Sequence, residues 1–204
     1  MGRAVIMAGA DIEDYTFYKK EAGDYVICAD RGYRHAIKLG VVPDILLGDF
    51  DSLDMPLPKG VKTITFPAEK DETDLQLAIL HAIDMGFRDI YIIGVFGGRA
   101  DHFLGNIGLL KLAHEKGATA VLEDADTKIH FVDGSITLPN THTYLSVIPL
   151  FEDVVLSIEG VKYPLTKKRL VRGDTLGISN EITAKEAHID ILEGSAFILL
   201  CREK

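Results

Sequence analysis

The first 124 residues alternate short β-rich runs with stretches of helical periodicity, and this alternation constrains the fold strongly. The β-rich runs cover residues 4–8, 25–29, 44–47, 63–66, 89–96 and 119–122. Two of the stretches between them carry an apolar stripe at helical spacing, one from Leu75 to Ile83 and one from Phe103 to Leu110. Strands that alternate with helices form a parallel sheet covered on its faces, so this half is predicted to be a doubly wound, mainly parallel α/β domain.

The helical periodicity fades after residue 126. Short strands separated by turn signals replace it, at residues 129–132, 144–148, 154–158, 170–171, 188–191 and 197–200. Turns are expected at Asp133-Gly134, Pro139-Asn140 and Glu159-Gly160. This pattern predicts an all-β sandwich or small barrel, and the chain therefore divides into domains of residues 1–126 and 127–204.

Charge and composition limit the partners of the chain. A net charge of −9 disfavours nucleic acid and anionic membranes, because both attract basic surfaces. No apolar run approaches the ~18 residues of a membrane-spanning helix. Cys28 and Cys201 lack metal-ligand spacing and indicate core residues of a protein in a reducing compartment. We therefore expect a cytoplasmic protein, in which a phosphate ligand would need a metal ion as intermediary.

Three acidic clusters follow predicted strands: Asp49-Phe50-Asp51, Asp71 to Asp74, and Asp101. The carboxyl ends of parallel strands share one edge of a sheet, so these clusters are expected to meet there. In an extended chain Asp49 and Asp51 would converge while Phe50 turned towards the core. Converging carboxylates suit Mg²⁺, which takes one or two protein carboxylates and fills its other positions with water and phosphate oxygens. An ordinary polar turn is the alternative for this segment.

The segment Gly97-Gly98-Arg99 also follows an apolar strand, and its backbone amides and guanidinium could hold phosphate oxygens. Asp74 follows Thr73, a plausible N-cap, so its carboxylate would lie near a helix N-terminus. Asp71 could face the same site or cap that helix. Of the seven histidines, His102 adjoins these clusters. The chain contains neither a P-loop nor a Gly-x-Gly-x-x-Gly dinucleotide motif.

Together these motifs resemble the bacterial thiamine pyrophosphokinase family. The matching segments are residues 29–32, Pro43-Asp44 leading to 48–52, 71–75, 97–102 with Asn106, and 177–181. They occur in the family's order and extend into the β-rich half. One departure is Arg31, at a position where many members have a second glycine.

The resemblance implies transfer of a pyrophosphoryl group from ATP to thiamine, which gives thiamine diphosphate and AMP. It also implies a homodimer whose active sites are shared between the α/β domain of one subunit and the β domain of the other. The catalytic residues implied are Asp49, Asp51, Asp71 and Asp74, of which Asp49, Asp51 and Asp74 would bind Mg²⁺. The nucleotide-binding residues implied are Asp30, Gly97, Gly98, Arg99, Asp101, His102 and Asn106. Ser179 and Asn180 would contact thiamine from the partner subunit.

Two alternatives to this function remain open at this point. A metal-dependent nucleotide phosphohydrolase would use the same acidic edge with water as acceptor, and only the match in the β domain favours an organic acceptor. A non-catalytic sensor of nucleotide or thiamine would keep the cleft without needing every metal ligand, and the intact Asp49, Asp51 and Asp74 argue against it. For the thiamine reaction, the sequence does not decide whether Asp71 or Asp101 accepts the hydroxyl proton.

Overall fold

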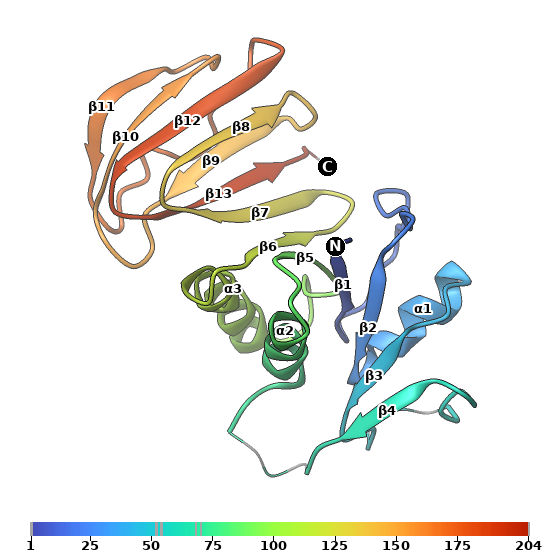
Figure 1. The fold of residues 1–204 in the computed structure, drawn as a ribbon. Coiled ribbons are helices and arrows are strands. Elements are labelled where there is room, and N and C mark those ends of the chain that lie inside the picture. The colour runs from blue at the N-terminus through green and yellow to red at the C-terminus, as the bar shows by residue number, and fades with distance from the viewer. Residues whose placement is uncertain (1, 52, 54, 68, 70, 204) are drawn as a thin grey trace. The chain divides into compact units, whose positions relative to one another are not determined.

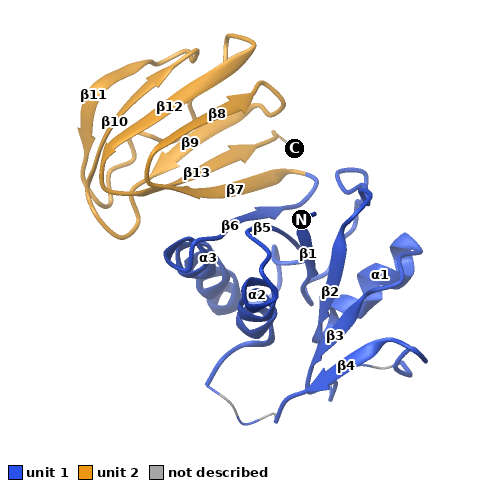
Figure 2. Ribbon diagram, viewed as in Figure 1, with its two compact units in different colours: residues 1–125 blue, residues 126–204 orange. Residues whose placement is uncertain are grey.

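The computed structural model describes residues 2–51, 53, 55–67, 69 and 71–203. The chain divides into two compact units, residues 1–125 and 126–204 (Figure 2). Each unit has a hydrophobic core of its own.

Unit 1 is built on a parallel sheet, as the alternating pattern predicts (Figure 1). Its strands are β1 (Ala4–Met7), β2 (Tyr25–Ala29), β3 (Ile45–Gly48), β4 (Lys62–Thr65), β5 (Asp89–Ile93) and β6 (Thr119–Glu123). The strand order in this unit is β4-β3-β2-β1-β5-β6, and neighbouring strands are parallel. From β1 the chain first builds the sheet in one direction and later returns to add β5 and β6 on the other side. The switch point of the sheet therefore lies between β1 and β5.

Helices lie on both faces of this sheet (Figure 1). They are the short 3₁₀ helix η1 (Asp30–Gly32), α1 (Tyr33–Leu39), α2 (Asp74–Asp84) and α3 (Ala100–Glu115). Helix α1 packs against β1 and β2, whereas α2 packs against β1, β2, β3 and α3. The apolar stripes correctly predicted α2 and α3. None of the helices in the described part of the chain is long and apolar enough to cross a membrane.

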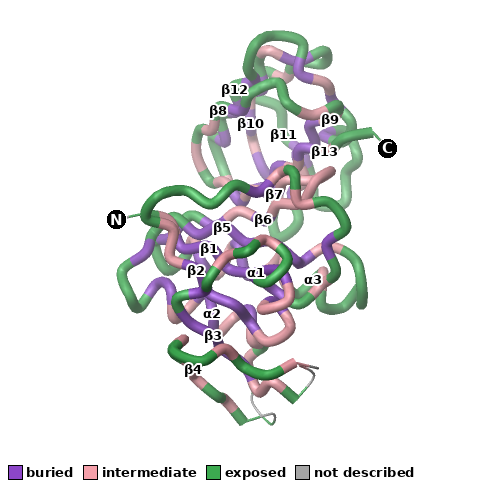
Figure 3. Tube along the Cα trace, turned by 90° about the vertical axis from the view of Figure 1, so that its right-hand side faces the viewer, coloured by how far each residue is buried: buried purple, intermediate pink, exposed green. Residues whose placement is uncertain are grey.

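The core of unit 1 is centred on rows of buried aliphatic side chains. Ile6 on β1 is in register with Ile27 on β2 and with Ile92 on β5, and all three are fully buried. Figure 3 shows buried residues along β1, β2, β3 and β5. Burial on both faces explains why these strands are continuous apolar runs in the sequence.

Unit 2 is an antiparallel β structure, which confirms the predicted all-β class for the second half. Its strands are β7 (Thr127–Val132), β8 (Ser135–Pro139), β9 (Tyr144–Ile148), β10 (Val154–Glu159), β11 (Leu165–Leu170), β12 (Glu186–Glu193) and β13 (Ala196–Cys201). Within the unit, β7, β13 and β9 form one layer, and β11, β10, β12 and β8 form the other. Leu145 and Ile198 from the first layer share a core with Leu156 and Ile189 from the second, so the unit is a sandwich.

Three strand predictions need correction. The predicted strand 170–171 covers only the end of β11, because four of the six residues of this edge strand are exposed and it lacks an apolar run. Strand β8 was not predicted, and only Leu138 within it is fully buried. The run 89–96 ends as a strand at Ile93, because Gly94 adopts a φ of 74°.

Candidate active site

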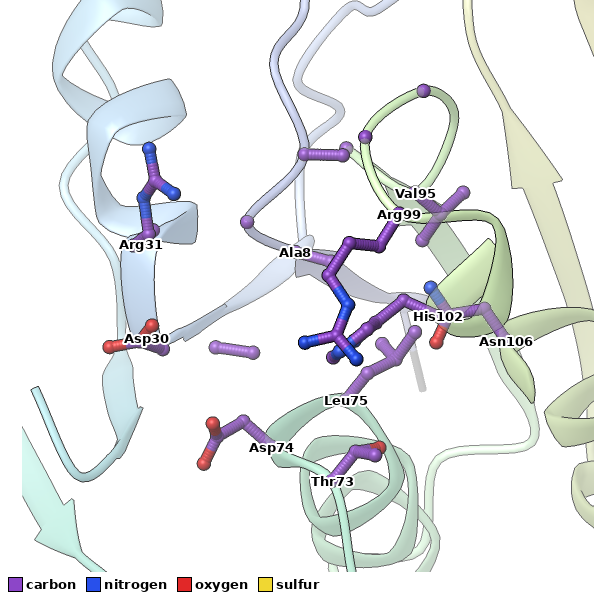
Figure 4. Close-up of a pocket in the computed structure, with 16 residues that line it drawn as sticks. Ala8, Asp30, Arg31, Thr73, Asp74, Leu75, Val95, Arg99, His102 and Asn106 are labelled. Carbon is purple, nitrogen blue, oxygen red and sulfur yellow. The ribbon is translucent and has the colours of Figure 1, made fainter. Parts of the chain in front are cut away.

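A pocket of about 450 Å³ opens at the switch point of the unit 1 sheet, beyond the carboxyl ends of β1, β2 and β5 (Figure 4). This volume is in the range of small-molecule sites. Strand ends supply Ala8, Gly9, Ala10, Ala29, Asp30, Arg31, Gly94, Val95, Gly97, Gly98 and Arg99. The start of α2 supplies Thr73, Asp74 and Leu75, and the first two turns of α3 supply His102 and Asn106. Asp30 and Arg31 lie on one side, Arg99 and His102 lie on the other, and Asp74 lies below (Figure 4).

The back wall of the pocket is backbone from the loops after β1 and β5. Ala8 donates its amide to the Ile93 carbonyl at 2.8 Å, and Ala10 donates to the Gly94 carbonyl at 2.8 Å. A Cβ at Gly94 would lie 2.4 Å from the Ala8 carbonyl oxygen, so only glycine allows this approach. The two loops are therefore held together as a continuation of the β1–β5 pairing.

His35 on α1 supports the first of these loops from behind. The residue is only 3% exposed. Nε2 lies 2.9 Å from the Ala10 carbonyl oxygen and Nδ1 lies 2.7 Å from the Tyr15 hydroxyl. A carbonyl can only accept, so Nε2 carries the proton and Nδ1 accepts from Tyr15. Burial lowers the pKa of His35; nearby Lys38 lowers it further, whereas the Ala10 hydrogen bond and Asp11 oppose the shift. The neutral ring thus joins Ala10 to Tyr15.

Asp30 and the Asp49 segment meet at the ends of β2 and β3. Asp30 has a φ of 44°, which is uncommon for a residue with a side chain. A Cβ at Gly48 would lie 3.1 Å from the Asp30 Cα, so the glycine lets the two backbones approach. Asp49 follows directly. Because β2 and β3 are parallel neighbours, their carboxyl ends share one edge of the sheet, and the two motifs lie together there as expected.

The extended geometry predicted for Asp49-Phe50-Asp51 is wrong. Phe50 has a φ of 59°, and the Asp51 amide donates to Oδ1 of Asp49 at 3.1 Å. The segment therefore forms a turn, although Phe50 does pack against the unit 1 core as expected. Neither aspartate lines the pocket. Ser52, the last residue of this motif, lies outside the described residues.

The start of α2 places one further carboxylate at the pocket. Thr73 is the N-cap, as predicted, because its side chain accepts from the Gln76 amide at 3.2 Å. Asp74 follows in the first turn and lines the pocket, whereas Asp71 is exposed and does not. Over the residues that the structure describes, no group of three or more Asp, Glu, His or Cys side chains is arranged to hold a metal.

Arg99 and Asp101 form a pair at the start of α3. The guanidinium donates to both carboxylate oxygens, at 2.5 Å and 3.1 Å. This pairing lowers the pKa of Asp101 to about 2, although 61% of the side chain is exposed. Asp101 lines a smaller adjoining hollow of about 250 Å³, which shares His102 and Asn106 with the main pocket.

Ser179 and Asn180 lie in unit 2 and have different surroundings. Asn180 is 7% exposed; its Nδ2 donates to the Tyr163 carbonyl, and its Oδ1 accepts from the amides of Tyr163 and Glu181. Ser179 is exposed, with a φ of 59° and an amide that donates to Ser146. The Asn180 amide is thus engaged within the unit, and Ser179 carries the accessible side chain.

Several pocket residues are not among the site residues that the family resemblance implies. They are Ala8, Gly9, Ala10, Ala29, Arg31, Thr73, Leu75, Gly94 and Val95. Gly9 and Ala10 carry a signal, since they follow the first β-rich run and lie at the shared edge. Arg31 adjoins a predicted nucleotide-binding aspartate. Leu75 and Val95 carry no such signal, because their apolar side chains fit a core equally well.

The pocket lies at the switch point of a parallel sheet and is lined by carboxylates, guanidinium groups and glycine-containing loops. The same chain has a second, all-β unit. These features define a two-domain enzyme of the α/β plus β class. The family described as Thiamin pyrophosphokinase, catalytic domain, matches residues 18–122. The family described as Thiamin pyrophosphokinase, vitamin B1 binding domain, matches residues 133–195.

Individual relatives agree with these matches. Thiamine pyrophosphokinase from Bacillus subtilis (strain 168) is 34% identical over 192 residues, which cover 90% of this chain and 89% of that protein. The crystal structure of the Bacillus subtilis enzyme superimposes with a TM-score of 0.89 at 30% identity, over 100% of both chains. That of thiamin pyrophosphokinase from Geobacillus thermodenitrificans gives 0.85 at 29% identity, over 100% of this chain and 99% of the other. The chain belongs to the thiamine pyrophosphokinase family, which confirms the predicted fold class, function and enzyme class.

We predict that His35→Phe lowers the free energy of unfolding by about 1–3 kcal/mol at neutral pH, because the Ala10 carbonyl and the Tyr15 hydroxyl lose their buried partner. Since the folded pKa of His35 is lowered, its stabilisation is complete above the ordinary value of 6.5 and is lost as the pH falls below it. Chemical denaturation from about pH 5 to about pH 7.5 measures both effects.

The control for this experiment is His188→Phe, because His188 is 56% exposed in unit 2. His81 and His130 also have lowered pKa values, so wild type and His35→Phe both lose some stability at acid pH because of them. The difference between wild type and His35→Phe is the informative quantity. An identical dependence of stability on pH in the two proteins would contradict the role of His35.

Proposed function

We propose that the unit 1 pocket binds ATP and that the enzyme transfers the β,γ-diphosphoryl group to the hydroxyl of thiamine. The observation that carries this proposal is the joint lining of one pocket by Asp30, Asp74, Arg31 and Arg99 with the two glycine-containing loops that follow β1 and β5. Backbone without side chains lets phosphates approach closely, and guanidinium groups bind phosphate oxygens. The proposal assigns this cluster to the nucleotide and leaves the β unit for thiamine.

The chemistry fits such a site. The thiamine hydroxyl oxygen forms a bond to the β-phosphorus, the bond from that phosphorus to the bridging oxygen of the α-phosphate breaks, and AMP leaves while the hydroxyl loses its proton. Such a transfer depends on in-line positioning and on stabilisation of charge over the phosphate oxygens. No covalent protein nucleophile is required.

We assign Mg²⁺ to Asp74, Asp49 and Asp51. Carboxylate oxygens suit this hard cation, which takes only one or two of them and fills its other positions with phosphate oxygens and water. Among the residues that the structure describes, these three carboxylates are not gathered into one ligand group, so the assignment rests on the chemistry of the donors and on their place at the edge of the sheet. Asp74 lines the pocket, and Asp49 follows Gly48, whose backbone lies against the pocket residue Asp30. When bound, the ion would neutralise charge on the phosphates.

Asp71 is the better candidate for the proton acceptor. Asp101 is paired with Arg99, which lowers its pKa to about 2 and makes it a weak base. Asp71 is exposed two residues before the Thr73 cap and forms no part of that pair.

We propose further that the enzyme is a cytoplasmic homodimer with shared sites, in which Ser179 from the partner contacts thiamine. The exposed side chain of Ser179 on a loop fixed by hydrogen bonds supports this part. Asn180 would then contribute by holding that loop. Cys28 and Cys201 are free cysteines, as is usual for a protein of a reducing compartment.

The proposed reaction predicts that AMP forms from ATP and Mg²⁺ only when thiamine is present, together with an equal amount of thiamine diphosphate. Chromatography of the reaction mixture measures both products. AMP or ADP formed at the same rate without thiamine would instead indicate a phosphohydrolase. Binding of either ligand without any product would indicate a sensor.

The metal assignment predicts that Asp74→Asn lowers turnover at limiting Mg²⁺ by on the order of 100-fold, because one ligand of the charge-neutralising ion is lost. Part of the loss should recover at high Mg²⁺. Asp84→Asn at the exposed far end of α2 is the matched control and should retain turnover. Asp51→Asn tests the second segment in the same way. Normal turnover of both variants at limiting Mg²⁺ would remove these residues from the metal site.

The shared-site proposal predicts that two inactive variants restore activity when refolded together. Asp74→Asn damages the α/β side, and Ser179→Tyr blocks the proposed thiamine side without removing the Asn180 hydrogen bonds. Random pairing should restore up to about one quarter of the wild-type sites, since about half of the dimers are mixed and each has one intact site. Light scattering confirms the assembly state. Mixed dimers without activity would show that each site is built within one subunit.

A further inference from the structure

Arg31 lines the pocket, and the Nε of its guanidinium has no hydrogen-bond partner among the residues that the structure describes. Arg31 lies in η1, beside Asp30 and across the pocket from Arg99 (Figure 4). Its Nε is buried and makes no hydrogen bond to any residue that the structure describes. Within the same part of the chain, no ion pair joins its guanidinium to a carboxylate. This buried Nε has therefore lost contact with water without gaining a hydrogen-bond partner from the described residues.

Arg99, the arginine that the sequence motifs single out, is already paired with a carboxylate. Both oxygens of Asp101 accept from its guanidinium, and 73% of its side chain is exposed. A phosphate at Arg99 would have to compete with that carboxylate. Arg31 is therefore the pocket arginine whose guanidinium is not paired with a carboxylate in the described part of the chain, which leaves it open to an anionic ligand.

The surroundings of Arg31 leave room for a ligand. The Arg31 Cβ lies 3.2 Å from the position that a Cβ on Gly9 would take. Its stem therefore lies against the small-residue loop Ala8, Gly9 and Ala10, whose backbone lines the same pocket. A phosphate near this loop could meet both the guanidinium and the glycine backbone.

We propose that Arg31 binds the polyphosphate of the nucleotide. This inference rests on the proposed binding of ATP in the pocket. A guanidinium suits the role because its planar donors match two phosphate oxygens and its charge does not titrate. Occupation by phosphate would also give the buried Nε the partner it lacks.

The test compares ATP with adenosine, since only ATP carries phosphates. Calorimetry should show that Arg31→Gln weakens binding of ATP with Mg²⁺ by about 10- to 100-fold, as expected for a charge-assisted contact, and leaves adenosine binding unchanged. Arg31→Lys should fall between wild type and Arg31→Gln. The loss should diminish as salt is raised, because salt screens the charge. Arg202→Gln, at an exposed arginine of unit 2, should bind both ligands as wild type does.

Equal losses for ATP and adenosine would overturn the proposal, since Arg31 would then act on the base, the ribose or the fold. Unchanged ATP affinity in Arg31→Gln would overturn it as well. These outcomes are separate from the reaction itself, because binding is measured without turnover. If wild type binds ATP but makes no thiamine diphosphate, the proposed function fails while the Arg31 assignment can still hold.

Discussion

The close approach of the Ala8 and Gly94 backbones is the constraint on which the rest of the site depends. Strands β1 and β5 are parallel neighbours, but the chain leaves them in different directions, and their following loops would separate without further contacts. The hydrogen bonds of Ala8 and Ala10 extend the pairing beyond the strands. The missing side chain at Gly94 permits this, and His35 fills the space behind. One face of this junction is therefore core, and the other face is the pocket.

Much of the fold follows from local patterns that survive in the sequence. Buried parallel strands are continuous apolar runs, and α2 and α3 carry stripes because each covers one face of a sheet. The pocket residue Arg99 follows from a strand position, since the strand ends share an edge, whereas Asp74 follows from its place at a predicted helix start and Asp30 from the family resemblance. Helix α1 gives no clear stripe, because it has seven residues and buries only His35 and Ala36. Edge strand β11 has no apolar pattern in the sequence either, since four of its six residues are exposed and it is held by pairing with β10.

The remaining details of the site depend on packing that no spacing encodes. The turn at Phe50 replaces an extended segment because the Asp49 side chain accepts the Asp51 amide. Asn180 resembles a ligand-binding residue in sequence, yet its amide is engaged by Tyr163 and Glu181. In both cases a short polar side chain could bind either a nearby backbone group or a ligand, and here it binds the backbone group. Sequence patterns identify such residues as polar and turn-forming, but only coordinates identify the partner.

Backbone strain gives a physical reason why short motifs carry the family resemblance. Three of the four described non-glycine residues with positive φ, namely Asp30, Phe50 and Ser179, lie in those motifs, and Lys167 is the fourth. A left-handed conformation costs such residues on the order of 1–3 kcal/mol and persists only where the surroundings impose it. Here the surroundings are the Gly48 backbone for Asp30, the unit 1 core for Phe50, and the hydrogen bond to Ser146 for Ser179. Because this support comes from the folded units, the backbone at the motifs is oriented before any ligand arrives, which reduces the ordering cost of binding.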